Sequence, residues 1–365
     1  MRGVPCVLMR GGSSKGLFFL ATDLPADAEA RDRLLLAAMG SPDRRQIDGL
    51  GGGDDQTSKV MIVSRSHTPG VDIDYQFGQV SVARGTVDLT PTSGNMLAAV
   101  APFAIDRGLL PAADGRTTVR MQDRNSGHRI DAVVRTPGGR VAYQGDFRLD
   151  GVPGTGAPIR LHFTNPAGRA TGRLLPTGRA CDTVDGVHVT CIDFANPMVM
   201  VAADAVGKTG YETKAELDRD AEWLARLETL RQAAARLMGI QDAGTLPKVV
   251  LLAPPRAGGM ITSRYFTPGN CHAAHALTGA LGVTAACHIP GSVAAEQVRW
   301  GGALPGHVVI EHPAGMLEAS VGAPGAADDA GRLACGTVAA TARPLFSGEV
   351  LVRASALSPV NAPLA

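Results

Sequence analysis

The chain has 365 residues, 45% of them hydrophobic and 19% charged, which is enough to bury one or two cores and makes two domains the default expectation. Its 35 Lys and Arg residues balance 34 Asp and Glu residues. No block of like charge could follow a phosphate backbone, so nucleic acid is not an expected partner. No apolar run approaches the ~20 residues of a membrane span, and we therefore expect a cytoplasmic protein with no membrane partner.

The cysteines and glycines indicate a reducing compartment and a fold rich in turns. Six cysteines are dispersed without a CxxC pair, at positions 6, 181, 191, 271, 287 and 335, which favours free thiols over disulfides. The histidines show no HxH or HExxH spacing, so we expect no metal site. The 45 glycines and 24 prolines, with only 4% aromatics, favour a β-rich fold over a helical bundle.

Short β-type runs bounded by Gly, Pro or Asp recur along the chain, with the spacing of antiparallel sheets linked by short turns. In the first half these predicted strands lie at 5–10, 16–21, 59–65, 71–82, 129–136 and 140–147. In the second half they lie at 187–193, 197–203, 247–255, 307–313 and 348–354.

Four predicted helices interrupt the strands. Residues 26–39 and 213–238 carry charge on one side and an apolar stripe on the other, which is typical of outer helices. Residues 95–105 and 274–286 are apolar all round and rich in Ala and Gly, so each should be enclosed on every side.

The two enclosed helices are introduced by related strings, TPTSGN at 90–95 and TPGNCH at 267–272. A chance match remains one explanation. The other is an α+β fold of two similar, β-rich, barrel-like domains, each wrapped around a buried helix. We place these domains at 1–184 and 185–339, with a strand within 340–365 as a candidate to return to the first domain. Helix starts facing a shared cleft would bind carboxylates, so an acidic small molecule is the expected ligand.

The segment MRGGSSKG near the N-terminus matches a nucleophile elbow only formally. Such an elbow needs a helix after the serine, and here the residues LFFLA predict a strand. It is not a P-loop either. The turn is either an ordinary hairpin or an anion-binding loop that uses Ser13, Ser14 and Lys15.

Several further side chains have both a structural and a functional interpretation. Lys59 ends a glycine-rich loop and is either a solvated strand-end lysine or a desolvated base. Arg264 is either a carboxylate clamp or part of an exposed salt bridge. Cys271 and His272, at the predicted start of the second buried helix, are candidates for proton transfer or ligand contact, whereas His275 is better explained as a core histidine.

A resemblance to a known family rests on motifs that follow one order along the chain: MRGGSSKG, MGSPDRRQIDGLGG, TSKV, SGNMLAAVAPFAIDRGLL, DGVPGTGAPI, LLPTG, VTCID, GKTGYE, PKVVLLAPPR and TARPLFSG. From about residue 2 to 352 the sequence resembles the PrpF and 4-oxalomesaconate tautomerase family. The resemblance implies a diaminopimelate-epimerase-like fold with the active site between two domains. Family members shift a double bond in a branched di- or tricarboxylate by 1,3-proton transfer, without cofactor or metal. Their substrates include 4-oxalomesaconate, methylaconitate and methylitaconate. The oligomeric state stays open, with a homodimer as one candidate.

The resemblance also implies roles for individual residues. Lys59 is the leading candidate base, with Cys271 and Ser93 as further candidates for the proton-transfer machinery. The implied substrate-binding residues are Ser13, Ser14, Lys15, Ser58, Gly94, Asn95, Met96, Arg264 and His272.

Ser93 departs from the family pattern, because the resembled enzymes carry a cysteine at this position. A serine does not ionise near neutral pH, whereas a thiol at a helix start does. Three outcomes stay open. Lys59 alone moves the proton while Ser93 binds substrate, or Cys271 or His272 donates instead, or the protein has become a non-catalytic polycarboxylate-binding accessory protein. If the protein is an isomerase, the alternative to 4-oxalomesaconate as its substrate is methylaconitate or aconitate.

Overall fold

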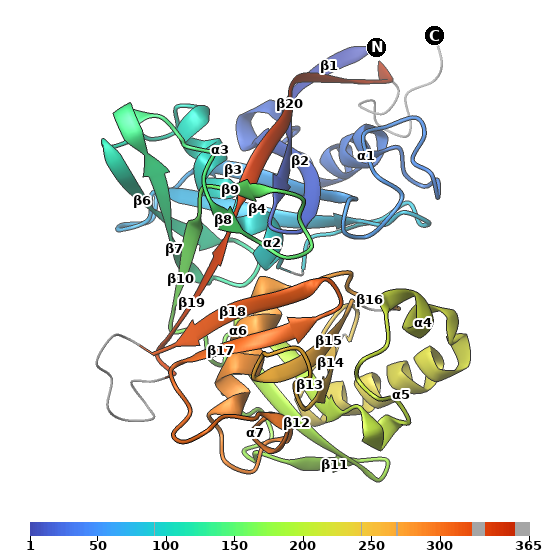
Figure 1. Ribbon diagram of the computed structural model, residues 1–365. Helices are drawn as coiled ribbons and strands as arrows, with labels where there is room; N and C mark the ends of the chain where they lie inside the picture. Colours follow the sequence, from blue (N-terminus) through green and yellow to red (C-terminus); the bar gives the residue numbers. More distant parts are fainter. Residues whose placement is uncertain (91, 242, 268, 323–332, 355–365) are drawn as a thin grey trace.

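The structure is a computed structural model that describes residues 1–365 with the exception of 91, 242, 268, 323–332 and 355–365. The chain forms two lobes, one above the other in Figure 1, and strands β10 and β19 run between them. The described residues contain no helix that is long and apolar enough to cross a membrane.

The first lobe is built mainly from the N-terminal half of the chain. Its strands are β1 (Arg2–Gly11), β2 (Ser14–Leu20), β3 (Lys59–Arg65), β4 (Ile73–Val80), β5 (Val87–Asp88), β6 (Gly115–Asp123), β7 (Arg129–Thr136), β8 (Phe147–Arg148), β9 (Thr155–Gly156), β10 (Ile159–Thr164) and the C-terminal β20 (Ala342–Val352). Its helices are α1 (Ala28–Met39), α2 (Gly94–Leu97) and α3 (Val100–Asp106), with 3₁₀ turns at Ala21–Asp23 and Pro137–Gly139.

The second lobe follows the same plan. Its strands are β11 (Asp182–Val184), β12 (Val187–Phe194), β13 (Asn196–Ala202), β14 (Lys248–Ala253), β15 (Ile261–Thr267), β16 (Asn270–Cys271), β17 (His307–His312), β18 (Gly315–Val321) and β19 (Cys335–Ala340). Its helices are α4 (Lys214–Arg219), α5 (Ala221–Leu237), α6 (Leu277–Cys287) and α7 (Val293–Gln297), with a 3₁₀ turn at Asp204–Val206.

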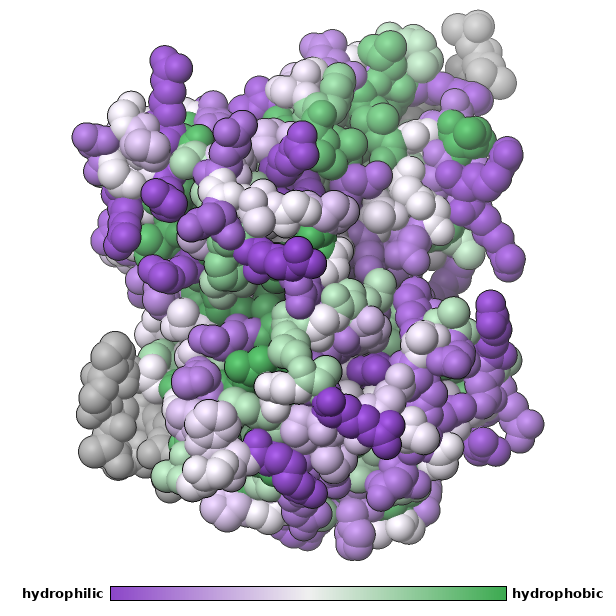
Figure 2. All heavy atoms as spheres, viewed as in Figure 1, coloured by the Kyte–Doolittle hydropathy of each residue, from purple (hydrophilic) through white to green (hydrophobic). Residues whose placement is uncertain are grey.

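Strand pairing ties distant parts of the sequence together. Strand β20 pairs antiparallel with β1 along its whole length, and β19 pairs with β10. The expected boundary at 184/185 falls inside the hairpin that β11 forms with β12. We therefore propose that the division between the domains lies before β11 and that β20 belongs to the first domain. Apolar side chains of β20, including Leu345, Phe346 and Leu351, remain exposed. Figure 2 shows hydrophobic residues gathered at the top of the molecule, over the ends of β1 and β20 in Figure 1.

The buried helices form as their composition predicts. Every residue of α6 is buried, because a helix that is apolar all round has no face to offer to water. In the adjoining strands β13 and β14, alternate side chains point to opposite faces of the sheet. Met198 and Val250 join the core around α6, while Val199 and Leu251 pack against α5 on the other face. These strands are buried on both sides, which explains their continuous apolar runs.

Three element predictions were wrong in detail. The helix predicted at 213–238 is two helices, because Asp220 ends α4 and caps α5 by accepting a hydrogen bond from the Trp223 N–H. The strand predicted at 140–147 is reduced to the two-residue β8 at its end. The strands β5, β6, β9, β10, β11, β15, β16, β18 and β19 and the helix α7 were not predicted. The helix predicted at 95–105 divides into α2 and α3.

Candidate active site

A cavity of about 390 Å³ lies between the lobes, and residues of both lobes line it. Its walls meet where α2 and α6 begin. A side chain at Gly94 would place its Cβ 2.8 Å from the backbone nitrogen of Thr278, so only glycine lets the two helix starts touch. Gly12 has a φ of +52°, and a Cβ there would lie 2.4 Å from Asn95 Oδ1. The two glycines therefore fix how closely these segments pack around the cavity.

Lys59 is the first residue of β3 and projects into the cavity. Its Nζ donates a hydrogen bond to Gln79 Oε1 at 3.0 Å and lies 5.1 Å from the centre of the Phe77 ring. The Gln79 amide nitrogen donates to the backbone oxygens of Asp55 and Ser58, both at 3.0 Å. These two bonds fix the orientation of the Gln79 amide, so that its oxygen faces the lysine.

The environment of Lys59 suits a base. The side chain is 7% exposed, and burial lowers its pKa from 10.5 to about 8, although the carboxylates of Asp55 and Asp54 partly oppose the shift. Desolvation disfavours the charged ammonium. About a tenth of Lys59 is therefore a neutral amine at pH 7 and about half at pH 8, with a lone pair that can accept a proton.

His272 lines the cavity from the second lobe and is 3% exposed. The glycine-rich loop at 46–58, which precedes Lys59 and is called the lysine loop below, belongs to the first lobe. Its Nδ1 accepts a hydrogen bond from the Ala274 N–H at 3.0 Å, so the ring hydrogen belongs on Nε2. This Nε2 lies 3.3 Å from Asn95 Nδ2, and because the amide nitrogen is also a donor, the two do not hydrogen-bond each other in this tautomer. Burial, followed by the charges of His275 and Lys59, holds the pKa of His272 well below its usual value. The imidazole is therefore neutral and offers an N–H donor rather than an acidic proton.

Ser93 lines the cavity as the residue that precedes α2. Its side chain makes no capping hydrogen bond to the helix. Helix α2 has only 4 residues, so its dipole is small, and the binding of a carboxylate at its start stays a prediction. The Ser93 hydroxyl is placed to hydrogen-bond a ligand directly.

The remaining implied binding residues divide into two groups. Ser14, Gly94 and Asn95 line the cavity. The others lie outside its lining: Ser13, Lys15, Ser58 and Met96. The Ser58 hydroxyl accepts a hydrogen bond from Gln46, and Met96 is fully buried in the core around α3, so both support the lysine loop and the helix from behind.

Two expectations for the second lobe need correction. The string at 267–272 does not open a helix, because it forms the β15–β16 hairpin and α6 begins only at Leu277. Cys271 does not line the cavity. Its thiol packs in the apolar cluster under α5, and burial raises the pKa of Cys271 to about 12. Arg264 also lies outside the lining and donates to the backbone oxygens of Glu212 and Ser263.

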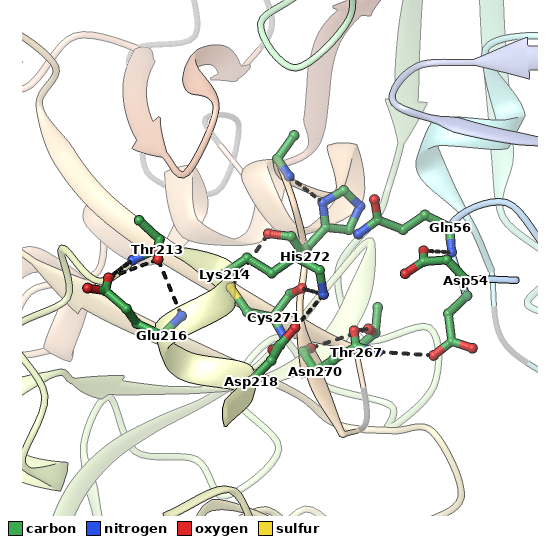
Figure 3. A network of polar contacts seen from close by, with 12 residues as sticks. Asp54, Gln56, Thr213, Lys214, Glu216, Asp218, Thr267, Asn270, Cys271 and His272 are labelled. Atoms are coloured by element: carbon green, nitrogen blue, oxygen red, sulfur yellow. Dashed lines mark hydrogen bonds and ion pairs between the residues drawn. The ribbon is translucent and has the colours of Figure 1, made fainter. Parts of the chain in front are cut away.

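A polar network joins the lobes beside the cavity (Figure 3). Asn270 Nδ2 donates to Asp55 Oδ2 at 3.3 Å, from the β16 hairpin to the lysine loop. Behind the hairpin, Lys214 donates to the Cys271 oxygen at 2.8 Å, and Asp218 accepts from the Cys271 N–H at 2.7 Å. The loop that carries Asp55 is therefore fixed to the second lobe, which helps to position Lys59.

Sequence reasoning missed several cavity residues. Gln79 and Phe77 lie in the middle of the predicted strand at 71–82, where alternation alone gave them no role. Lys248 is the first residue of β14, lines the cavity and is 8% exposed. Its only sequence signal was its place in the PKVVLLAPPR motif. Among the described residues, no group of three or more His, Cys, Asp or Glu side chains could hold a metal ion.

Comparison with known proteins finds relatives along the whole chain. A family model described as PrpF protein matches residues 1–353. The (4E)-oxalomesaconate Delta-isomerase of Novosphingobium sp. (strain KA1) is 48% identical over 354 residues, which cover 96% of this chain and 98% of that protein. The crystal structure of methylitaconate-delta-isomerase aligns with a TM-score of 0.79 at 34% identity, over 99% of this chain and 98% of that one.

A hydroxyproline epimerase from Agrobacterium vitis aligns over 96% of this chain and 92% of that one, with a TM-score of 0.57 and 12% identity. A likeness at this identity shows the fold alone. Together with the two-lobed architecture, it confirms the α+β, epimerase-like fold predicted from the sequence. The match over residues 1–353 and the relative at 48% identity show that this chain belongs to the PrpF family.

Proposed function

We propose that this chain is an isomerase that shifts a carbon–carbon double bond in a branched polycarboxylate such as 4-oxalomesaconate, by a 1,3-allylic proton transfer. The observation that carries the proposal is the buried Lys59, whose amine lies in a cavity at the lobe interface and is oriented by Gln79. The Novosphingobium relative at 48% identity, a (4E)-oxalomesaconate Delta-isomerase, supports the choice of substrate.

The reaction requires only that one proton moves between two carbons. Neutral Lys59 takes a proton from the carbon next to the unsaturated carboxylate or keto group, and the electron pair of the broken C–H bond spreads into a dienolate. The Lys59 ammonium then returns the proton to the carbon at the other end of the allylic system. The double bond moves by one position, nothing is oxidised or reduced, and the base returns to its starting state.

The other cavity residues fit this chemistry. The His272 N–H and the Ser93 hydroxyl can donate hydrogen bonds to oxygens that become negative in the dienolate. Cys271 does not line the cavity, so the geometry favours Lys59 as the group that both removes and returns the proton. Relatives at 48% and 44% identity are a (4E)-oxalomesaconate Delta-isomerase and a 4-oxalomesaconate tautomerase. We therefore favour the isomerase over the accessory protein.

Proton exchange tests this function. The protein is incubated with 4-oxalomesaconate, methylaconitate or aconitate in deuterated water, and NMR follows both deuterium incorporation and the position of the double bond. The wild type should isomerise at least one of these compounds, and Lys59→Met should abolish the reaction. No isomerisation of any substrate by the wild type would refute the isomerase, and a fully active Lys59→Met variant would remove Lys59 as the base.

A further inference from the structure

A second lysine faces the same cavity, and the mechanism gives it no role. Lys248 begins β14 in the second lobe, is 8% exposed, and lines the cavity that also contains Lys59. Its side chain makes no hydrogen bond or ion pair with any residue that the structure describes. A buried cation without a partner is costly, so its retention at this place indicates a negative partner that arrives with the ligand.

The acidic groups near Lys248 do not serve as that partner. Asp55 is hydrogen-bonded by Asn270, and Asp88 accepts two hydrogen bonds from Thr90. Neither carboxylate forms an ion pair with Lys248. Both are close enough to raise its pKa, but burial and the positive charges of Lys59 and Arg231 outweigh them and lower it to about 7.

Lys248 faces more than one cavity. It also lines an adjoining cavity of about 300 Å³, together with Arg84, which lies at the exposed boundary between the two cavities. The basic groups of this second cavity are not equivalent, because Arg231 is held by Glu228 through two hydrogen bonds of 2.7 Å. Of the buried basic groups Lys248 and Arg231, Lys248 is thus the one that remains available to a ligand.

We propose that Lys248 binds the third carboxylate of the substrate, so that this site selects tricarboxylates over dicarboxylates. The inference rests on the function proposed above and narrows its substrate class. An ammonium and a carboxylate that meet in a site shielded from water form a strong, charge-assisted hydrogen bond. A dicarboxylate has no group for this position and leaves the buried ammonium unpaired, which disfavours its binding.

Binding of two inert probes tests the selection without turnover. Tricarballylate is glutarate with one additional carboxylate on its central carbon, so the pair isolates a single charged group. Calorimetry should show that the wild type binds tricarballylate about 10- to 100-fold more tightly than glutarate. Lys248→Met should abolish this preference and leave the affinity for glutarate nearly unchanged, whereas Lys248→Arg, which keeps the charge, should retain most of it.

Two further measurements distinguish recognition from general damage. With 4-oxalomesaconate, Lys248→Met should raise KM about 10- to 100-fold and lower kcat much less, because a lost binding contact acts on the ground state and the transition state alike. Calorimetry at pH 8 in buffers of different ionisation enthalpy should show proton uptake when tricarballylate binds to the wild type. This uptake should fall in Lys248→Met.

These experiments distinguish a failure of the Lys248 carboxylate site from a failure of the proposed isomerase function. Equal affinity of the wild type for both probes, or an equal loss of both affinities in Lys248→Met, would overturn the role of Lys248. A wild type that prefers tricarballylate in a Lys248-dependent way but isomerises nothing in deuterated water would instead refute the proposed function and leave the carboxylate site intact.

Discussion

Replacing the buried Lys59 by methionine should stabilise the protein while it abolishes catalysis. Burial lowers the pKa of Lys59 from 10.5 to about 8, and each pKa unit corresponds to about 1.4 kcal/mol. Folding with a charged Lys59 at pH 7 therefore costs about 3 kcal/mol. The substitution also removes the hydrogen bond to Gln79 and leaves its oxygen unpaired, which costs about 1 kcal/mol. The expected net gain at pH 7 is about 2 kcal/mol.

The pH dependence of this gain identifies its cause. Between the folded pKa of about 8 and the unfolded value of 10.5, the unfolded wild type holds a proton that the folded protein has released. The stability of the wild type relative to Lys59→Met therefore rises with pH across this window. Below pH 8 both states are protonated and the whole penalty is present. The advantage of Lys59→Met should be largest near pH 7 and should shrink by about 3 kcal/mol by pH 10.5.

Urea denaturation of the wild type and Lys59→Met at pH 7 and pH 10 measures both quantities. Lys15→Met is the matched control, since Lys15 is partly exposed and lies outside the cavity. We expect it to change the free energy of unfolding by no more than about 0.5 kcal/mol at either pH. The reasoning is refuted if Lys59→Met is less stable than the wild type at pH 7, or if the difference between them does not change with pH.

The other predictions concern activity. Because the base must be neutral, kcat at saturating substrate, where the bound carboxylate keeps Lys248 charged, should rise between pH 6 and 10 through about pH 8, the pKa of Lys59, and then level off; a kcat profile that is flat across pH 8 would contradict this. Gly94→Ala should lower the free energy of unfolding by about 1–3 kcal/mol, because the new methyl group meets Thr278; thermal unfolding without a loss of stability would show that α2 and α6 can separate freely. Cys271→Ser should keep kcat close to the wild-type value in steady-state assays, and a loss of about 100-fold or more would restore the thiol as a proton donor. Ser93→Cys should gain no rate, and a clear rise in kcat would show that a thiol at this position takes part in the reaction.

The elements that depend on local pattern were predictable from the sequence. A helix such as α6, with no polar face, must be enclosed whatever surrounds it, and strands such as β3 and β7 alternate or run apolar between turn residues. The pairing of β20 with β1 brings opposite ends of the chain together, and no local pattern reports such a contact. Strand β6 was missed because its outer face carries Arg116 and Arg120, which are exposed and are not among the residue types enriched in strands.

The candidate site was predictable only where a motif marked it. Lys59 follows a glycine-rich loop, and Asn95 and Ser93 introduce an apolar helix, so all three were predicted as site residues. Lys248 was not singled out, because a lysine at the start of a strand is usually solvated. It is buried because the lobes close over it, and this is a property of the tertiary structure. Cys271 is the opposite case. Its thiol next to His272 in the sequence predicted a role in proton transfer, but the side chain packs in the core.

The reactivity of Lys59 depends on the closed arrangement of the lobes. Burial is the largest cause of its lowered pKa, and its nearest charges, those of Asp55 and Asp54, act in the opposite direction. The base is therefore maintained by the exclusion of water, and the second lobe contributes to that exclusion through His272 and through the contact between Asn270 and Asp55. If the lobes separated, water would solvate the ammonium and the pKa of Lys59 would move back toward 10.5. The same closure that encloses the cavity thus also lowers the pKa of the amine toward the range in which it can act as a base.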